Sequence, residues 1–372
     1  MIAGTPQRRV CPSATIRAPW YRRAMFRSHH PRNALSVLLM AACAATNPKT
    51  ADGSGDASAD ASVAGTTDVS TEADAGADVA IGEPDAASND SSSGTPEEDT
   101  HTAAPVFPTA PERLGGERPA VINLPEAYTA EKQWPLLLLL HGYSANGFVQ
   151  DVYLGISKRA NVDGVLVLVP DGTVDSEGNQ FWNATNACCD KDASGVDDEG
   201  YLLGLIAEAR KHYNVDPKRI FALGHSNGGF MSYRLACSRS DLFAGVVVLA
   251  GAMWKDPGSC PAENPVSVLH VHGTEDETIP YEGTFAYPSA RGSAEFWAGV
   301  DGCDGPPTPA AATLELDAKV PGAETTVETW SGCDAGTSVE LWTLVKGKHL
   351  PGFVDESFAK GTLGFLLAHP KP

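Results

Sequence analysis

Apolar residues in the C-terminal two thirds of this chain gather in short runs that polar stretches separate. Continuous apolar runs are typical of strands that helices cover on both faces, and apolar residues at helical spacing are typical of amphipathic helices. The predicted strands span residues 121–124, 136–140, 165–169, 219–223, 243–250, 266–271 and 339–345, and the predicted helices span 202–213, 230–237 and 358–367. This alternation predicts an α/β fold with a mostly parallel central sheet and helices on both faces. Residues 105–372 suit one domain of this kind.

The predicted helix at 202–213 has charges of opposite sign at its two ends. Asp197 and Asp198 precede it, while Arg210 and Lys211 lie in its last turn. The helix dipole favours this arrangement. We interpret the two aspartates as capping residues first and as part of a pocket rim second.

A pentapeptide of the pattern G-x-S-x-G, Gly224–Gly228, joins the strand at 219–223 to the helix at 230–237. In this context the motif indicates a nucleophile elbow, the tight turn on which α/β-hydrolases carry their nucleophile. The turn leaves room only for small neighbours, which the glycines around Ser226 provide. A serine in an ordinary turn is the alternative, and the flanking strand and helix disfavour it.

A carboxylate follows this serine at the end of a later strand, as a triad in the chain order Ser, Asp or Glu, His requires. Asp276 lies in the loop after the strand at 266–271 and is the predicted acid. Glu275 and Glu277 compete with it, and a merely solvated carboxylate is the simpler alternative.

The predicted base is His349, which follows the alternating segment at 339–345. The other histidines near the motifs, His225, His270 and His272, flank the elbow or lie within a strand, and we interpret them as structural. A metal at 270 and 272 is the alternative, but two alternate strand residues without a Cys or carboxylate partner are a poor ligand set. We therefore expect no metal and no cofactor.

Several ordered segments carry a resemblance to a known family. They are Leu140–Tyr143, Val169–Gly172, Trp182–Ala184 with Cys188–Cys189, Val196–Tyr201, Tyr213–Ile220, the elbow, Met231–Cys237, His272–Asp276 with Ile279–Tyr281, and Lys348–Gly352. On these residues the chain resembles the secreted polyhydroxybutyrate-depolymerase and feruloyl-esterase group of α/β-hydrolases, related to carbohydrate esterase family one. The resemblance implies the α/β-hydrolase fold, the triad Ser226, Asp276 and His349, and an oxyanion hole from the backbone N–H groups of Tyr143 and Asn227.

The sequence departs from the family at one position, because Leu350 follows the base where the family usually has Trp. That Trp would wall the site near the base, so its absence bears on specificity and not on the chemistry. Trp182 and Tyr281 are the candidate substrate-binding residues, with Tyr143 and Trp254 as further ones. Buried packing is the alternative for each of them.

Together these residues predict an exported serine carboxylester hydrolase that works through an acyl-enzyme. Its expected substrates are feruloyl or acetyl esters of polysaccharides, or polyhydroxybutyrate-type oligomers. The alternatives are a surface-displayed, non-catalytic binding protein on a hydrolase scaffold and a serine peptidase on the same fold. Residues 101–372 contain 19 basic and 34 acidic residues, so nucleic acid is not expected as a partner.

The first 104 residues have a different composition. Basic residues precede the apolar stretch Ala34–Ala42, which is too short to span a bilayer, and Cys43 follows it. This predicts an export signal over 1–43, with Met25 as the suspected true start and Cys43 as a lipidated residue; an ordinary signal peptide is the alternative. Residues 44–104 predict a disordered acidic tether. We expect a cell-surface or outer-membrane lipoprotein that contacts the membrane only through its lipid anchor, or alternatively a secreted protein.

Six of the eight cysteines lie in the predicted domain. An even number of cysteines in an exported protein suggests disulfides. The resemblance and the proximity in sequence favour the pairs Cys237–Cys260 and Cys303–Cys333, each of which stabilises by about 3–4 kcal/mol if chain entropy dominates. Cys188 and Cys189 are expected either as a vicinal disulfide or as thiols.

Overall fold

The computed structural model describes residues 111–372. The predicted export signal, the suspected start at Met25, the lipidation site at Cys43 and the tether at 44–104 lie outside the described residues. Within 111–372, no helix has both the length and the apolar character needed to cross a membrane.

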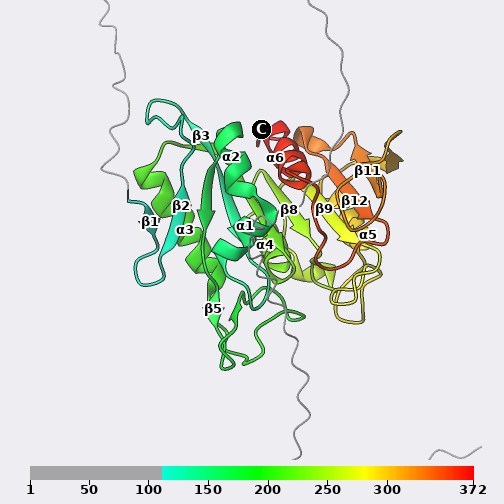
Figure 1. Ribbon diagram of the computed structural model, residues 1–372, viewed down its shortest axis with the longest axis horizontal. Coiled ribbons are helices and arrows are strands. Elements are labelled where there is room, and N and C mark those ends of the chain that lie inside the picture. The colour runs from blue at the N-terminus through cyan, green and yellow to red at the C-terminus, as the bar shows by residue number, and fades with distance from the viewer. Residues whose placement is uncertain (1–110) are drawn as a thin grey trace, which may run out of the picture. The chain divides into compact units, whose positions relative to one another are not determined.

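Ten strands form one sheet in the order β1-β2-β4-β3-β7-β8-β9-β12-β11-β10 (Figure 1). The six central strands, β4, β3, β7, β8, β9 and β12, pair in parallel. The outer strands, β1 and β2 at one edge and β11 and β10 at the other, pair antiparallel. The strands are β1 (Arg113–Leu114), β2 (Ala120–Asn123), β3 (Trp134–Leu140), β4 (Leu166–Val169), β7 (Val215–His225), β8 (Gly245–Leu249), β9 (Ser267–Gly273), β10 (Asp304–Pro309), β11 (Thr325–Ser331) and β12 (Val339–Leu344). A separate ribbon consists of β5 (Thr173–Val174) and β6 (Gln180–Phe181). The mostly parallel sheet agrees with the sequence prediction.

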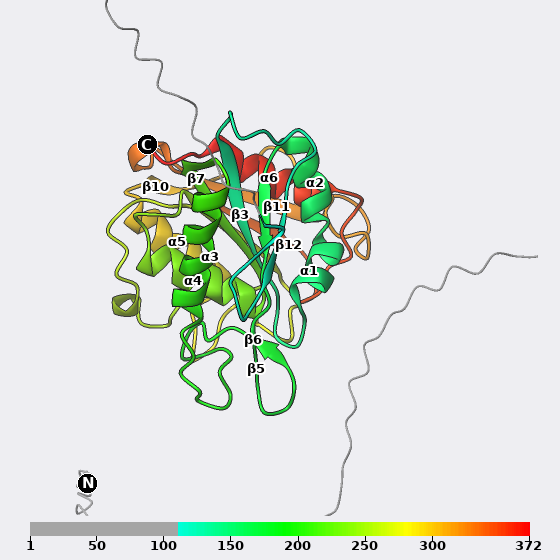
Figure 2. The same ribbon diagram turned by 90° about the vertical axis from the view of Figure 1, so that its left-hand side faces the viewer.

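Helices cover both faces of the sheet, as Figure 2 shows. One face carries α3, α4 and α5, and the other carries α1, α2 and α6. Their bounds are α1 (Gly147–Leu154), α2 (Ile156–Asp163), α3 (Asp198–His212), α4 (Asn227–Ser238), α5 (Ala290–Val300) and α6 (Ser357–Ala368). The predicted layers of helix, sheet and helix are confirmed.

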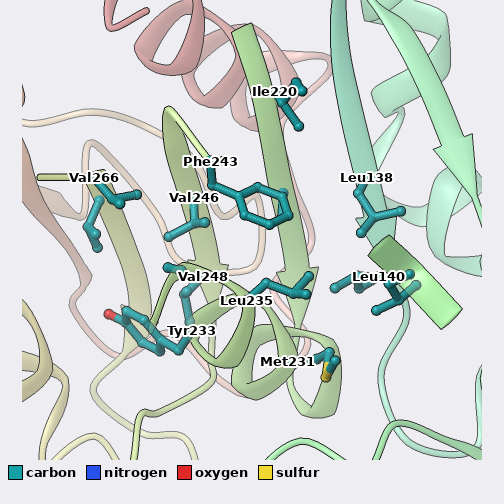
Figure 3. Packing of buried hydrophobic residues seen from close by; sticks show 14 of the residues in the cluster. Leu138, Leu140, Ile220, Met231, Tyr233, Leu235, Phe243, Val246, Val248 and Val266 are labelled. Carbon is teal, nitrogen blue, oxygen red and sulfur yellow. The ribbon is translucent and has the colours of Figure 1, made fainter. Parts of the chain in front are cut away.

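Each face of the sheet has its own hydrophobic core. Side chains alternate along a strand, so Leu138 and Leu140 of β3 pack under α4 (Figure 3), whereas Leu137 and Leu139 pack on the side of α1 and α6. All residues of β3 are buried. This two-sided burial is the physical reason why the strand is a continuous apolar run.

Three disulfides connect the cysteines of the domain. Cys237–Cys260 and Cys303–Cys333 form as the resemblance implied, and Cys188 and Cys189 form a vicinal disulfide rather than two thiols. The first pair ties the end of α4 to the loop after β8, and the second ties the residue before β10 to the loop between β11 and β12.

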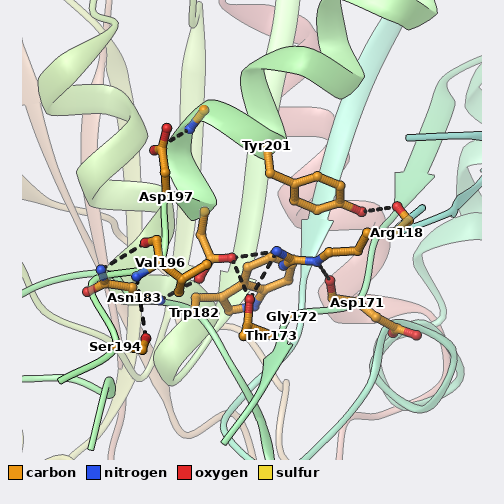
Figure 4. A network of polar contacts seen from close by, with 12 residues as sticks. Arg118, Asp171, Gly172, Thr173, Trp182, Asn183, Ser194, Val196, Asp197 and Tyr201 are labelled. Atoms are coloured by element: carbon orange, nitrogen blue, oxygen red, sulfur yellow. Dashed lines mark hydrogen bonds and ion pairs between the residues drawn. The ribbon is translucent and has the colours of Figure 1, made fainter. Parts of the chain in front are cut away.

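Figure 4 shows the polar network at the start of α3. Asp197 is the N-cap, and its Oδ1 accepts from the backbone N–H of Gly200 at 2.8 Å, which confirms the capping prediction for this residue. Asp198 has a different role, because its side chain is buried and pairs with Arg118 at 2.7 Å. Its other oxygen accepts from the backbone N–H of Asn183 at 2.7 Å. Asp198 therefore joins three distant segments of the chain.

The hydrophobic pattern missed α1, α2, α5 and the edge strands. In α1 the large side chains Phe148 and Val152 are 75% and 68% exposed, so this helix does not show one clean apolar face. Strand β10 is largely exposed and contains Pro306 and Pro307, residues that only an edge strand tolerates because its outward N–H groups need no partner. Elements of this kind lack the apolar runs on which the prediction depended.

Asp301 is a fully buried carboxylate at the end of α5. Its Oδ1 accepts from the backbone N–H of Val266 at 3.0 Å, and its Oδ2 has no partner within 111–372. Burial raises the pKa of Asp301 from 3.8 to about 7. The folded chain therefore holds this proton more tightly than the unfolded chain, and the resulting stability is lost as the pH rises from about 4 to about 7.

We expect Asp301→Asn to be more stable than the natural chain by about 1–3 kcal/mol at pH 8 and about equally stable near pH 3.5, where the aspartate is protonated in the folded chain and largely protonated in the unfolded chain. The amide keeps an oxygen for Val266 but never ionises. Chemical denaturation of both proteins at the two pH values tests this expectation. A gain of the same size at both values would contradict it, because the effect would then not come from ionisation.

Candidate active site

Ser226 lies on the sharp turn between β7 and α4. Its φ of 54° and ψ of −119° are values that non-glycine residues rarely adopt. A Cβ on Gly224 would overlap the backbone of Gly228, and a Cβ on Gly228 would overlap the backbone of Leu140. Both glycines are therefore required for the close approach of the turn to β3. This is the geometry of a nucleophile elbow.

Ser226, Asp276 and His349 meet at the carboxyl ends of β7, β9 and β12. His349 Nδ1 lies 2.7 Å from Asp276 Oδ2, and His349 Nε2 lies 2.9 Å from Ser226 Oγ. An ionised carboxylate only accepts, so Nδ1 carries the proton and Nε2 accepts from the serine hydroxyl. The structure thus brings together the three predicted residues with the connectivity that activates a serine.

Asp276 is held in place by four donors. Its Oδ1 accepts from the backbone N–H groups of Thr278 and Ile279, each at 2.8 Å, and its Oδ2 lies 3.3 Å from His272 Nε2 as well as close to His349. Burial acts to raise the pKa of Asp276, but the hydrogen bonds from His272 and His349 outweigh it and lower the pKa below its ordinary value. The carboxylate is therefore ionised at neutral pH.

The two competing acids lie elsewhere. Glu275 and Glu277 are exposed and approach Lys348 at 3.2 Å and 3.7 Å. Neither side chain belongs to the cluster around His349, so the geometry singles out Asp276 among the three.

His225 holds the backbone of the candidate base. Its Nε2 donates to the carbonyl oxygen of His349 at 3.0 Å, and the two rings lie 4.9 Å apart between centroids. Burial, reinforced by the charge that His349 can carry, lowers the pKa of His225 to about 3. Its ring is therefore neutral at neutral pH, and the structural interpretation of this histidine agrees with its contacts.

The three residues that follow the base are held by three further hydrogen bonds. Lys319 Nζ donates to the Leu350 carbonyl at 2.8 Å, Tyr153 OH donates to the Pro351 carbonyl at 2.9 Å, and the Gly352 N–H donates to Asp317 Oδ1 at 2.7 Å. We call residues 349–352 the base loop. The side chain of Leu350, which replaces the family's Trp, is 41% exposed.

The loop after β3 lies against the candidate nucleophile, because a Cβ on Gly142 would come 3.4 Å from the Cβ of the serine. The hydroxyl of Tyr143 donates to Asp175 at 2.5 Å, and Lys191 Nζ lies 4.0 Å from the centre of its ring. Asn227 opens α4, where the first N–H groups have no partner inside the helix. The two predicted oxyanion donors thus belong to segments on either side of the serine.

Trp182 requires a correction, because it is fully buried and offers no surface to a substrate. Its Nε1 donates to the His141 carbonyl at 3.0 Å, and its backbone exchanges two hydrogen bonds with the side chain of Asn227 at 2.7 and 2.9 Å. Trp182 therefore joins the two oxyanion segments from behind. The aromatic ring in the sequence gave no sign of which of the two roles it has.

Tyr281 is half-buried beside the acid. Its hydroxyl lies 2.9 Å from Thr343 Oγ1, and its ring meets that of His272 edge to face at 5.7 Å. Contact of Tyr281 with a substrate stays a prediction.

A cavity of about 710 Å³ opens between α4 and two loops, 183–191 and 254–261. Trp254 and the Cys188–Cys189 disulfide contribute to its wall. Lys191, which lies over the ring of Tyr143, is also part of the lining. The cavity is therefore next to one of the predicted oxyanion segments, and its volume is typical of a small-molecule site.

Residues 111–279 match the family model Esterase, a range that includes Ser226 and Asp276 but not His349. The chain is 29% identical over 247 residues to Feruloyl esterase B of Piromyces equi, covering 63% of this chain and 43% of that protein. It is 27% identical over 221 residues to Bifunctional acetylxylan esterase/xylanase XynS20E of Neocallimastix patriciarum, covering 59% and 29%. The chain is similar to feruloyl esterase-like α/β-hydrolases. These matches support the feruloyl-esterase part of the predicted resemblance.

The chain spans less than half of the length of both relatives. A solved structure with the same fold is "Acetyl xylan esterase from Aspergillus awamori", which superposes with a TM-score of 0.51 over 69% of this chain and 98% of that chain. The sequence identity is 13%, so the likeness concerns the fold alone. The predicted α/β-hydrolase fold is confirmed.

The sequence analysis missed one contact of this α/β-hydrolase site. His272 was interpreted as structural, but its Nε2 lies 3.3 Å from the carboxylate of Asp276. The available signal was the spacing, because His272 ends a strand four residues before the acid and a tight loop returns the acid toward it.

Proposed function

We propose that this protein is a serine carboxylester hydrolase. The observation that carries the proposal is the hydrogen-bonded path from Asp276 through His349 to Ser226. A serine hydroxyl is a weak nucleophile unless a neighbouring base takes its proton, and this path supplies both the base and the group that orients it. The similarity of residues 111–279 to the Esterase family model supports the same chemistry.

In the proposed reaction Ser226 Oγ attacks the ester carbonyl while His349 Nε2 takes the hydroxyl proton. The imidazolium then gives this proton to the departing alcohol, which leaves an acyl-enzyme. A water molecule, deprotonated by the same imidazole, releases the acid and restores the serine. The N–H groups of Tyr143 and Asn227 stabilise the oxyanion, and one such donor is worth about 3–4 kcal/mol.

We infer that the substrate is a polysaccharide that carries feruloyl or acetyl groups, with polyhydroxybutyrate-type oligomers as the second candidate. Two observations support this order. The relatives include a feruloyl esterase and an acetylxylan esterase. In the cavity next to the predicted oxyanion segment, Arg234 is paired with Glu199 at 2.9 Å. The two other charged residues of the wall, Asp190 and Lys191, have opposite signs. The charges of the wall therefore balance, and its amide, hydroxyl and aromatic groups suit a neutral, hydroxyl-rich ligand.

The proposal predicts that the purified chain hydrolyses methyl ferulate or acetylated xylan with at least about tenfold higher kcat/KM than hydroxybutyrate oligomers, a difference of about 1.4 kcal/mol. Release of ferulate, acetate and hydroxybutyrate is measured under one set of conditions. If hydroxybutyrate oligomers have the higher kcat/KM instead, a polyester would replace the polysaccharide ester as the proposed substrate.

A non-catalytic binding protein and a serine peptidase are the two alternatives. A fluorophosphonate probe labels an activated serine, so a folded chain that stays unlabelled at Ser226 would favour the binding protein. Cleavage of peptides at rates that match or exceed ester hydrolysis would favour the peptidase.

We also propose that the protein is exported, either secreted or anchored through Cys43. Three disulfides support an oxidising compartment. Mass spectrometry of the mature N-terminus tests both cleavage and lipidation.

A further inference from the structure

Two histidines of β9 and a tyrosine of α4 form a hydrogen-bonded chain in the core. Tyr233 OH, labelled in Figure 3, lies 2.7 Å from His270 Nδ1, and His270 Nε2 lies 3.0 Å from His272 Nδ1. His272 Nε2 then lies 2.8 Å from the carbonyl oxygen of Ile279 and 3.3 Å from Asp276 Oδ2. The tyrosine and both histidines are at most 1% exposed. The chain therefore connects the core under α4 to the acid of the site.

When both imidazoles are neutral, the Ile279 carbonyl determines the position of every proton in this hydrogen-bonded chain. The Ile279 carbonyl only accepts, so His272 Nε2 carries the proton and His272 Nδ1 accepts. His270 must then donate through Nε2 and accept at Nδ1 from the hydroxyl of Tyr233. Burial lowers the pKa of His270 and raises the pKa of Tyr233, which keeps the imidazole neutral and the phenol protonated.

His272, the last residue of this hydrogen-bonded chain, places its Nε2 3.3 Å from Asp276 Oδ2, the same oxygen that contacts His349 Nδ1. Asp276 Oδ2 lies near His272 Nε2 and His349 Nδ1, while Oδ1 accepts hydrogen bonds from two backbone N–H groups. A rotation of the carboxylate would break these contacts together. A histidine pair that only filled the core would need partners, but its last N–H would not need to lie within 3.3 Å of this particular oxygen as well as on the Ile279 carbonyl.

We propose that His272 is a positioning residue of the esterase reaction, which acts through Asp276, and that His270 and Tyr233 hold its N–H between the Ile279 carbonyl and the carboxylate. This inference rests on the proposed function, because the orientation of Asp276 matters for turnover only if Asp276 is the catalytic acid.

Other ionisable groups surround the same carboxylate. They are His349 after β12, His225 at the end of β7, and Tyr281 and Tyr287 from the segment before α5, while Glu275 and Glu277 of its own loop are engaged by Lys348 in solvent. None of these other groups except His349 makes a hydrogen bond to Asp276 within the described range. The effect of removing the His272 N–H can therefore be read against an otherwise unchanged set of charges.

We expect His272→Leu to move the acid limb of the kcat/KM profile to higher pH by about 0.5–1 unit. A carboxylate with one donor fewer attracts the neighbouring imidazolium more strongly, so the base becomes available only at higher pH. His272→Gln is the matched variant, because its side-chain N–H₂ can donate where the imidazole Nε2 did, and its acid limb should stay within about 0.2 unit of the natural one. Hydrolysis of methyl ferulate across the pH range, with melting curves of all three proteins, gives the comparison. An unshifted limb in the folded Leu variant would overturn the proposal.

The predicted tautomers of His270 and His272 can be tested without measuring ester hydrolysis. In the full chain with ¹⁵N-labelled histidine and Ser226→Ala, ring-nitrogen shifts distinguish the tautomers, and His272→Gln identifies the His272 signals. We expect the Nε2–H tautomer at His270 and His272, with a change at His270 in Tyr233→Phe. The Nδ1–H tautomer at His272 would overturn the inference even in an active esterase. Failure of the natural chain on every ester would instead overturn the proposed function, whatever the tautomer.

Discussion

Replacing Ser226 by alanine is expected to lower kcat/KM for a good ester substrate by about four to six orders of magnitude. The variant keeps the oxyanion donors and the cavity but has no oxygen to form the acyl-enzyme. Alanine keeps the Cβ that makes φ 54° unfavourable at the elbow, so the backbone strain is unchanged and the fold is expected to be kept with little change in stability. Initial rates at high enzyme concentration, with thermal melting of the same samples, measure both effects.

A matched control is Ser357→Ala. Ser357 begins α6 on the opposite face of the sheet, and its buried Oγ has no partner within the described chain. The same chemical change there should leave kcat/KM within about twofold, as for a change away from the reacting groups. If Ser226→Ala lost only a few-fold activity, another group would have to be the nucleophile and the proposed mechanism would fail.

Asp276→Asn is expected to lower kcat by about 10⁴ with little change in KM. The amide can place its N–H₂ where Oδ2 now accepts, which makes His349 Nδ1 an acceptor and moves the imidazole proton to Nε2. An imidazole protonated on Nε2 cannot take the proton of Ser226. The shape of the site is unchanged, so the loss should appear in kcat and in the pH profile rather than in substrate binding.

The matched control for the acid is Glu275→Gln, the same change of carboxylate to amide one residue away. Glu275 is exposed and engaged only by Lys348, and we expect its loss to change kcat by less than about twofold. Comparable losses in both variants would show that the loop, and not the carboxylate on His349, is what matters.

The amino-acid pattern predicted the central strands and the three clustered residues for related physical reasons. Strands such as β3 and β8 are buried on both faces, so their runs of apolar residues are long and end abruptly where the chain reaches the sheet edge. Parallel strands place these ends side by side, and Ser226, Asp276 and His349 each follow one of them. Chain order and strand ends were therefore sufficient to select these residues.

Features that depend on side-chain packing were not predictable in this way. Trp182 looked like a pocket residue, yet it is enclosed by His141 and Asn227, and only the path of three separate loops decides this. The contact of His272 with Asp276 depends on how tightly the loop after β9 turns. The edge strand β10 and its neighbour β11 are too exposed to produce a continuous apolar run.

The base loop has a kinetic consequence for the resting protein. Each of the four residues from His349 to Gly352 is held by a hydrogen bond to a residue of the surrounding scaffold, and His349 Nε2 lies 2.9 Å from Ser226 Oγ. Because the base is held within reach of the nucleophile, we expect no slow ordering event before the first chemical step. Mixing with a large excess of an activated ester should therefore give an immediate burst of alcohol without a lag, with an amplitude that counts the competent molecules.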